Sequence, residues 1–250
     1  MCTGKTIRSS QPKHDTGESA PTDRVGGVIW ICSDLKGPIT PRYRRGNRYL
    51  LNFVDHKTNY CRVFLSKTKD QAAQKFEHFL VYFEKCYNFC VHLLRTDGGG
   101  EYKNIDLFCR DTQVARQITE AGNQAGNGKA ARMHRTVMNM VRCMIYSCDL
   151  PLSFWGDAAE YSAYVLNRMP KRSNPKRASP ITMLTGRPPS LVDIVVFGSP
   201  CETYRDPKKH CLKQRSEQGI ILGKSDETTG FRDFVWLPRD RVVITTRHIL

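Results

Sequence analysis

The sequence has no long hydrophobic run. Nowhere in its 250 residues do apolar side chains follow one another for the length of about 18 that a membrane-spanning helix requires. The first 25 residues also lack the apolar core of a secretory signal. These two absences argue against membrane insertion and secretion, so we expect an intracellular protein with no membrane partner.

Paired metal ligands are absent as well. The sequence contains neither a Cys-x-x-Cys pair nor paired histidines, and this ligand count excludes a structural zinc site. The ten cysteines are scattered singly through apolar segments, as at Cys32, Cys61, Cys109 and Cys143. A free thiol in such a segment behaves as a small hydrophobic group, so we expect a reducing compartment.

Acidic residues are scarce relative to basic ones. The chain has 39 Lys and Arg against 24 Asp and Glu, a net charge of +15. Residues 26–170 hold 20 basic against 13 acidic side chains, and residues 171–250 hold 15 against 8. The excess therefore belongs to the segments with apolar patterning. It favours a polyanionic partner, most often nucleic acid, although charge that serves only solubility is the alternative.

Hydrophobic periodicity predicts an α/β fold with a mixed sheet and flanking helices. Three strands in succession suggest an antiparallel meander, and a stripe at Ala72, Phe76, Phe79, Leu80 and Phe83 then indicates an amphipathic helix. The expected strands of this part span residues 28–32, 49–54, 61–65, 91–94 and 114–118, and its later helices lie near residues 105–110, 133–144 and 154–167.

Composition divides the chain into four parts. Residues 1–25 are rich in helix and strand breakers and read as a flexible lead-in, and the α/β core takes residues 26–170. A proline-rich linker is expected at 171–190. Residues 191–250 are expected to form a small all-β module with strands at 194–197, 219–223, 234–237 and 242–245.

Two aspartates occupy equivalent positions. The apolar run of the first strand leads into Asp34, and that of the fourth leads into Asp97. Carboxylates at the ends of neighbouring strands can converge on one point and share divalent cations, a geometry used in phosphodiester chemistry. The commoner role of a single aspartate at a strand end is to cap a turn.

Several segments in a fixed order resemble the integrase region of copia-type retrotransposon Pol polyproteins. The resemblance extends from about residue 26 to the C-terminus and continues through residues 196–198 and 219–223 of the expected β module. The segments that carry it are Cys32-Ser33-Asp34-Leu35-Lys36-Gly37-Pro38, Arg95-Thr96-Asp97-Gly98-Gly99-Gly100-Glu101-Tyr102, Asn127-Gly128-Lys129-Ala130-Ala131-Arg132-Met133-His134-Arg135-Thr136 and Leu150-Pro151-Leu152-Ser153-Phe154-Trp155.

The resemblance implies a retroviral-type integrase core with an RNase H-like fold, followed by an SH3-like module. It further implies a polynucleotidyl transferase with a three-carboxylate site that uses Mg²⁺ or Mn²⁺ to join DNA strands. Asp34 and Asp97 match the first two carboxylates and the metal ligands. Such integrases act on DNA as multimers, so the implied partners are DNA and further copies of the chain, and the implied location is the nucleus.

The third acidic position of the family is Ala131 in this sequence. Two carboxylates facing two divalent cations leave half of the positive charge uncompensated, and Mg²⁺ demands near-ideal oxygen ligation. The sequence therefore predicts weak or no strand transfer. Asp55, Glu101 and Glu120 are the acidic residues considered as replacements, and none matches the missing position. Upstream of such cores lies a zinc module, of which Cys2 is the candidate remnant.

Two basic groups are candidates for nucleic-acid contacts. Arg42, Arg44 and Arg45 fall in the turn between the first two strands, where a solvated hairpin is an equal alternative. Lys129, Arg132 and Arg135 fall on the long helix expected to face the site. For them the alternative is an exposed helix face.

Two other functions stay open at this point. The chain is alternatively a non-enzymatic nucleic-acid-binding protein derived from a transposon and kept for its basic surface. The remaining alternative is a transposon remnant without function.

Overall fold

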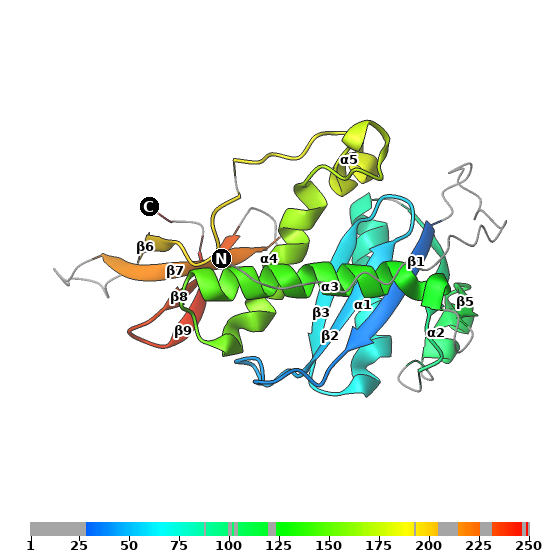
Figure 1. Cartoon of the computed structure of the whole chain (residues 1–250), viewed down its shortest axis with the longest axis horizontal. Coiled ribbons are helices and arrows are strands. Elements are labelled where there is room, and N and C mark those ends of the chain that lie inside the picture. The colour runs from blue at the N-terminus through cyan, green and yellow to red at the C-terminus, as the bar shows by residue number, and fades with distance from the viewer. Residues whose placement is uncertain are drawn as a thin grey trace, which may run out of the picture.

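Two β-sheets and two helices that connect them organise the chain in the computed structural model (Figure 1). A five-stranded sheet lies at one end of the molecule and a four-stranded sheet at the other. The structure describes residues 29–87, 89–99, 102, 105–119, 124–192, 194–204, 215–225, 232–246 and 249. The expected lead-in at 1–25 lies outside the described residues.

The first sheet is mixed, as the sequence predicts. Its strand order is β3-β2-β1-β4-β5. The three strands of the meander pair antiparallel, whereas β4 and β5 run parallel to β1 and to each other. The strands are β1 (Ile29–Lys36), β2 (Tyr49–Asp55), β3 (Cys61–Ser66), β4 (Val91–Thr96) and β5 (Ala115–Ile118).

Helix α1 (Ala72–Tyr87) covers one face of this sheet together with α2 (Ile105–Asp111). The predicted apolar stripe is confirmed, because all five of its members are buried. The ring of Phe53 from β2 stacks on that of Phe79 with the centroids 4.9 Å apart. Aromatic burial of this kind dominates the packing of the face.

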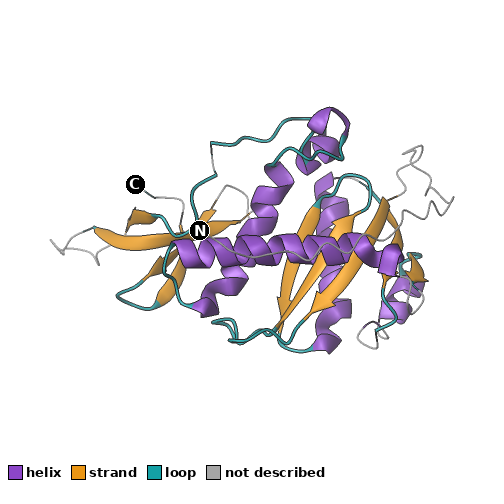
Figure 2. Ribbon diagram, in the orientation of Figure 1, coloured by secondary structure: helices purple, strands orange, loops and turns teal. Residues whose placement is uncertain are grey.

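Helices α3 (Gln124–Ser147) and α4 (Trp155–Arg168) cover the opposite face (Figure 2). Both helices continue past the first sheet and reach the second. One hydrophobic cluster therefore includes Val63 of β3, Val137 of α3, Tyr161 of α4 and Leu222 of the second sheet. The buried core of the α/β part therefore continues into the interface where the helices pack against the second sheet.

The second sheet is antiparallel throughout, with the order β6-β7-β8-β9. A small all-β module was predicted, but the expected strand at residues 194–197 is wrong. Those residues form an irregular segment whose Val195 backbone bonds to the hydroxyl of Tyr161 from α4. The strands are β6 (Pro200–Tyr204), β7 (Ser216–Ser225), β8 (Arg232–Leu237) and β9 (Val242–Thr246).

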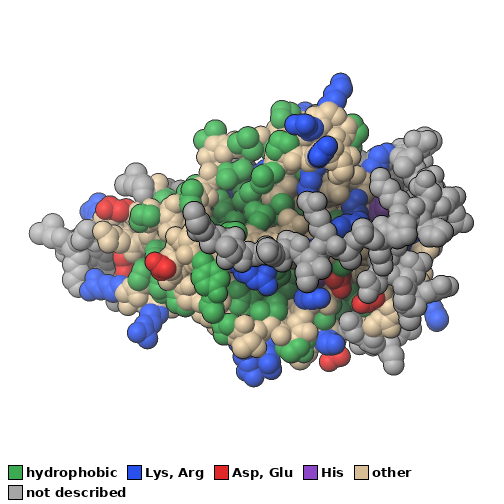
Figure 3. Space-filling view, in the orientation of Figure 1, with side chains coloured by type: hydrophobic (Ala, Val, Ile, Leu, Met, Phe, Trp, Pro, Cys, Tyr) green, Lys and Arg blue, Asp and Glu red, His purple; other side chains and the backbone are tan. Residues whose placement is uncertain are grey.

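The segment between α4 and the second sheet contains a further short helix, α5 (Pro180–Thr185), which begins where the Ser179 hydroxyl accepts a hydrogen bond from the Thr182 backbone. On the face seen in Figure 3, Lys and Arg side chains stand near α5, while hydrophobic side chains gather over α3 and α4. In the described part of the chain, none of the helices is both long and apolar enough to cross a membrane.

Candidate active site

Asp34 lies inside β1 and not at its end. Pairing with β2 continues as far as Lys36 opposite Leu50, so the strand runs past the apolar stretch that marked it in the sequence. Side chains alternate along a strand, and Asp34 therefore shares a sheet face with Trp30 and Cys32. This is the face that α3 covers.

Asp97 follows β4 directly. Strands β1 and β4 are parallel neighbours with Cys32 opposite Arg95. Two residues further along each strand, Asp34 and Asp97 come level with one another, on strands separated by about 4.8 Å. Asp97 is exposed and the Asp34 side chain is 16% exposed, so both carboxylates are open to solvent at the same end of the sheet.

The first half of α3 is fastened to β1 by side-chain amides. The Asp34 backbone N–H donates to Asn52 Oδ1 at 3.1 Å, and Asn52 Nδ2 donates to the Ala130 carbonyl at 2.9 Å. Asn127 Nδ2 donates to the Ser33 carbonyl at 2.8 Å. These bonds fix the position of the helix along β1, beside Asp34.

Ala131 lies within this fastened stretch. It follows Asn127 by four residues and precedes His134 by three, and His134 Nε2 is 2.8 Å from the Asp34 carbonyl oxygen. Residues three and four apart share a helix face, so Ala131 belongs to the side of α3 that faces β1 near Asp34. Its side chain is exposed and offers a methyl group instead of a ligand.

His134 orients Asp34 through the backbone. Its side chain is 3% exposed, and burial lowers the pKa of the imidazole to about 4. The ring is therefore neutral near neutral pH, with the proton on Nε2, which donates to the Asp34 carbonyl and lies 3.9 Å from Oδ2. Nδ1 is buried without a hydrogen-bond partner among the described residues.

The donor set does not fit a pair of divalent ions. Among the residues that the structure describes, no group of three or more His, Cys, Asp or Glu side chains is placed to hold a metal ion. Asp34 and Asp97 supply two carboxylates, and Ala131 supplies none. Magnesium prefers oxygen ligands in a near-ideal octahedron, so this pair of carboxylates is a poor match to a binuclear centre.

Asp55 is already used by the turn between β2 and β3. Its carboxylate accepts hydrogen bonds from the backbone N–H of Lys57 at 3.3 Å and of Thr58 at 3.0 Å, and the Thr58 hydroxyl also bonds to it. Asp55 stands opposite Ile31, three residues before Asp34 and about 10 Å along the strand. Glu101 and Glu120, the other two replacements considered, lie outside the described residues.

The three basic residues predicted on the long helix all lie on α3, in two different environments. Arg132 and Arg135 are exposed. Lys129 is half-buried, its ammonium group donates to the carbonyl of His56, and burial lowers the pKa of its amine. Arg132 and Arg135 are thus the more accessible candidates for a phosphate contact.

The three arginines of the hairpin differ in the same way. Arg42 and Arg45 are exposed, whereas Arg44 donates from Nε and Nη2 to the two carboxylate oxygens of Asp157 at 2.9 and 2.7 Å. The Tyr43 hydroxyl also donates to Asp157, at 2.9 Å. Arg44 fastens the hairpin to α4, so its guanidinium is already occupied within the fold.

A cluster that the sequence analysis did not single out lies on the same sheet face as Asp34. The Arg95 guanidinium stands 5.5 Å from the Trp30 ring centroid and donates to Gln117 Oε1 at 3.1 and 2.8 Å. His56 contacts the Trp30 ring, and its pKa is lowered by burial and by nearby Lys129 and Arg95. The sequence did contain a signal for this cluster, because alternate residues of a strand lie on the same face of the sheet. This alternation places Trp30 on the same face as Asp34, and Arg95 on the same face as Asp97.

The sequence has relatives among transposon proteins, although no protein-family model matches it. It is 33% identical over 226 residues to the retrovirus-related Pol polyprotein from transposon TNT 1-94 of Nicotiana tabacum, covering 88% of this chain and 17% of the relative. It is 27% identical over 203 residues to the retrovirus-related Pol polyprotein from transposon RE2 of Arabidopsis thaliana, covering 81% of this chain and 14% of the relative. The chain thus spans less than a fifth of either curated relative.

Solved structures share the fold at low sequence identity. The simian T-cell lymphotropic virus intasome, solved in complex with the PP2A regulatory subunit B56 gamma, matches with a TM-score of 0.50 and 13% identity over 89% of this chain and 77% of that one. The HTLV-2 integrase catalytic core, solved with magnesium, gives a TM-score of 0.46 and 15% identity over 63% of this chain and 95% of that one. The chain is a homologue of the retrovirus-related Pol polyproteins of plant transposons, and it shares its fold with the matched chain of the simian T-cell lymphotropic virus intasome.

Proposed function

We propose that this chain is the catalytic domain of a copia-type retrotransposon integrase that binds DNA but carries out strand transfer weakly or not at all. The kinship with Pol polyproteins supports the first half of the proposal. The second half rests on the residues around Asp34. The chain covers only a small part of these relatives, so the proposal concerns the integrase domain and not the other activities of the whole polyproteins.

The observation that carries the proposal is the position of Ala131. Asn127 and His134 lie one turn away on either side of Ala131. Each makes a hydrogen bond of 2.8 Å to the backbone of β1, and these bonds hold this part of α3 against the strand. A carboxylate at position 131 would therefore face the Asp34 and Asp97 pair. A methyl group there leaves the pair one acidic ligand short of the three that the resemblance implies.

The proposed metal is one Mg²⁺ or Mn²⁺ ion held loosely by Asp34 and Asp97. An integrase metal polarises phosphoryl oxygens when it is bound. The chain's own contribution would be to orient Asp34 through the Asn52 and His134 hydrogen bonds. Arg132 and Arg135 would hold the DNA backbone through phosphate contacts, which fix position without reading sequence.

The partner is DNA, and the location that follows from a DNA partner is the nucleus. We further propose that the chain works as a homo-oligomer. The net charge of +15 supports a polyanionic partner.

A strand-transfer assay with Mn²⁺ on a blunt duplex tests the proposal. The wild-type protein is expected at background, and Ala131→Glu is expected to raise the rate by about tenfold or more, because losing even a residue that only orients a metal ligand commonly costs about 10–100-fold in metal affinity or activity. Ala131→Gln is the matched control, since it adds a side chain of nearly the same shape without the charge. Robust transfer by the wild type, or equal activation by both variants, would contradict the proposed impairment.

DNA binding is measured separately by fluorescence anisotropy with the same duplex. The wild type and both position-131 variants should bind with the same affinity, because position 131 is proposed to act on the metal and not on DNA. An absence of duplex binding by all three proteins would remove the integrase proposal itself.

A further inference from the structure

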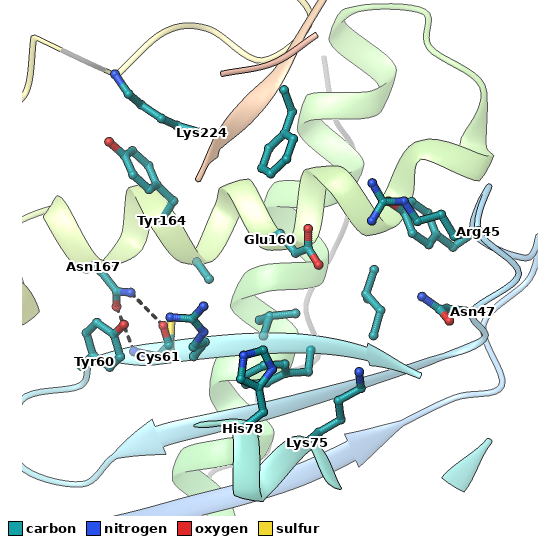
Figure 4. A pocket seen from close by; sticks show the side chains of 17 residues that line it. Arg45, Asn47, Tyr60, Cys61, Lys75, His78, Glu160, Tyr164, Asn167 and Lys224 are labelled. Atoms are coloured by element: carbon teal, nitrogen blue, oxygen red, sulfur yellow. Dashed lines mark hydrogen bonds between the residues drawn. The ribbon is translucent and has the colours of Figure 1, made fainter. Parts of the chain in front are cut away.

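A cavity of about 340 Å³ opens beside the outer edge of β3 (Figure 4). Strand β3 forms one wall, α1 and α4 contribute the sides, and Lys224 of β7 and Phe234 of β8 lie at the second sheet. Its volume is in the range of about 300–1,000 Å³ that small-molecule sites occupy. The cavity sits where the two sheets and both helix layers meet.

This cavity is distinct from the candidate active site. Strand β3 ends the sheet, with β2 and β1 between it and β4, the strand that Asp97 follows. None of Asp34, Asp97 and Ala131 lines the cavity. The strand-transfer chemistry proposed above therefore does not explain why basic residues line this cavity.

Basic side chains outnumber acidic ones around this space. Glu160 of α4 is the one acidic residue among the lining residues, whereas four Lys and Arg and a histidine also line it. The five come from the hairpin, β3, α1 and β7, which are far apart in the sequence. They are Arg45, Arg62, Lys75, His78 and Lys224.

Glu160 also acts on side chains other than these five. Its carboxylate acts electrostatically on Arg44 and on Tyr43. One carboxylate offsets only part of the positive charge of the four Lys and Arg side chains that line the cavity. In a concave site with low-dielectric walls, such an excess attracts anions.

The cations approach from different sides. In Figure 4, Lys224 lies above the space, Lys75 and His78 lie below it, and Arg45 closes one end. Arg62 is held in place by Tyr82, because its guanidinium lies 3.7 Å from the centroid of that ring. A held cation loses less side-chain entropy when a ligand binds.

This arrangement suits a phosphate group better than a carboxylate. A carboxylate presents two acceptor oxygens in one plane, whereas a phosphoryl group presents three acceptor oxygens and up to two negative charges. Lysines bind phosphate as point charges from any direction, and arginine adds a planar fork of donors. Cations on three sides of one small space match the phosphate geometry.

We propose that the cavity beside β3 binds a phosphate-bearing anion through Arg45, Arg62, Lys75 and Lys224. The source of the phosphate is a free polyphosphate or the backbone of a nucleic-acid single strand. The site serves as a second anion-binding surface, separate from the carboxylate pair.

Isothermal titration calorimetry of the full chain with inorganic tripolyphosphate at low salt tests this proposal. We expect saturable binding of one anion, and Lys75→Gln with Lys224→Gln should weaken it by about tenfold or more, since each removes a charge-assisted contact. The matched control combines Lys85→Gln with Arg187→Gln, which removes the same charge from exposed positions outside the cavity. That control should stay within about twofold of wild type, because exposed charges act weakly at this range.

Equal weakening by both double variants would overturn the proposal, because it would reduce the effect to net charge. The absence of saturable binding in the wild type would overturn it as well. Each single variant, Lys75→Gln and Lys224→Gln, repeats the measurement at half the charge change. Tripolyphosphate should also raise the midpoint of thermal unfolding of the wild type and of the control, but less that of the cavity variants.

Competition identifies the source of the phosphate. If a short single-stranded oligothymidylate displaces tripolyphosphate from the wild type at matched phosphate concentration, the natural ligand is a nucleic-acid backbone. If it does not, the ligand is a free polyphosphate. Both results support the site, and both are independent of whether Ala131 disables strand transfer.

Discussion

Asn167 pairs with the backbone of Cys61 through both ends of its amide. Its Oδ1 accepts a hydrogen bond from the Cys61 N–H at 2.8 Å, and its Nδ2 donates to the Cys61 carbonyl at 2.7 Å. Cys61 begins β3, the edge strand of the five-stranded sheet. The side chain of a helix thus takes the place of a neighbouring strand at this residue.

Removing that amide should destabilise the fold. Asn167→Ala leaves a buried N–H and a buried C=O without partners, at an expected cost of about 2–4 kcal/mol in the free energy of unfolding. Urea unfolding followed by circular dichroism measures it. Asn139→Ala, which removes an exposed asparagine of α3, is the control and should change the value by less than about 0.5 kcal/mol. An unchanged stability in Asn167→Ala would mean that the Cys61 groups find other partners.

Gly198 should tolerate no side chain. Its φ is +85°, and a Cβ there would lie 2.3 Å from Cys148 Cβ at the end of α3. Gly198→Ala is expected to lower the free energy of unfolding by about 2–4 kcal/mol, because left-handed strain and overpacking add. Gly186 has a φ of +72°, and a Cβ added there would meet no atom within 4 Å, so Gly186→Ala should cost only the strain, about 1 kcal/mol. Equal losses in the two variants would show that packing against Cys148 contributes nothing.

Stability should fall when the pH drops below about 6.5 in metal-free buffer. The pKa of His134 is about 4 in the folded chain and 6.5 ordinarily, so between these values the unfolded state binds the extra proton. The free energy of unfolding should therefore decrease on the order of 2 kcal/mol between about pH 7 and pH 5. Chemical unfolding at the two pH values measures it, and His134→Asn should show a smaller decrease than wild type. A variant that follows the same pH curve would assign the effect to other groups.

DNA binding should depend steeply on salt. If Arg132 and Arg135 each neutralise one phosphate, replacing both by Gln should make the slope of log K against log salt shallower by about 1.8. Anisotropy titrations of one duplex at several salt concentrations give the slope. Lys85→Gln with Arg110→Gln, exposed and outside α3, is the charge-matched control, and an equal change in both pairs would count against contacts on α3.

Residues with local patterns were predictable from the sequence, and those with distant partners were not. The stripe of α1 and the meander follow from side-chain periodicity, and both are confirmed. Periodicity also leads to Asp34 and Asp97, because each follows an apolar strand. The end of β1 was misplaced, since Ser33 and Lys36 are polar but still pair with β2.

The supports of the site escaped prediction for a physical reason. Asn52, Asn127 and His134 act through hydrogen bonds to backbone groups dozens of residues away. Nothing in the neighbouring sequence of a polar residue specifies such a partner. The wrong strand at residues 194–197 has the same origin, because its apolar residues pack against α4 and the Tyr161 hydroxyl satisfies the backbone at Val195.

The shared cluster that joins α4 to the second sheet limits how the chain can be shortened. Tyr161 of α4 packs against Phe197 and lies beside Gly223 of β7, and Phe154 meets Trp236 of β8 with ring centroids 5.0 Å apart. A fragment that stops at residue 190 would leave these rings facing water. Such a fragment should aggregate on expression. A soluble minimal version should need β7 and β8 to cover the apolar side chains of α4.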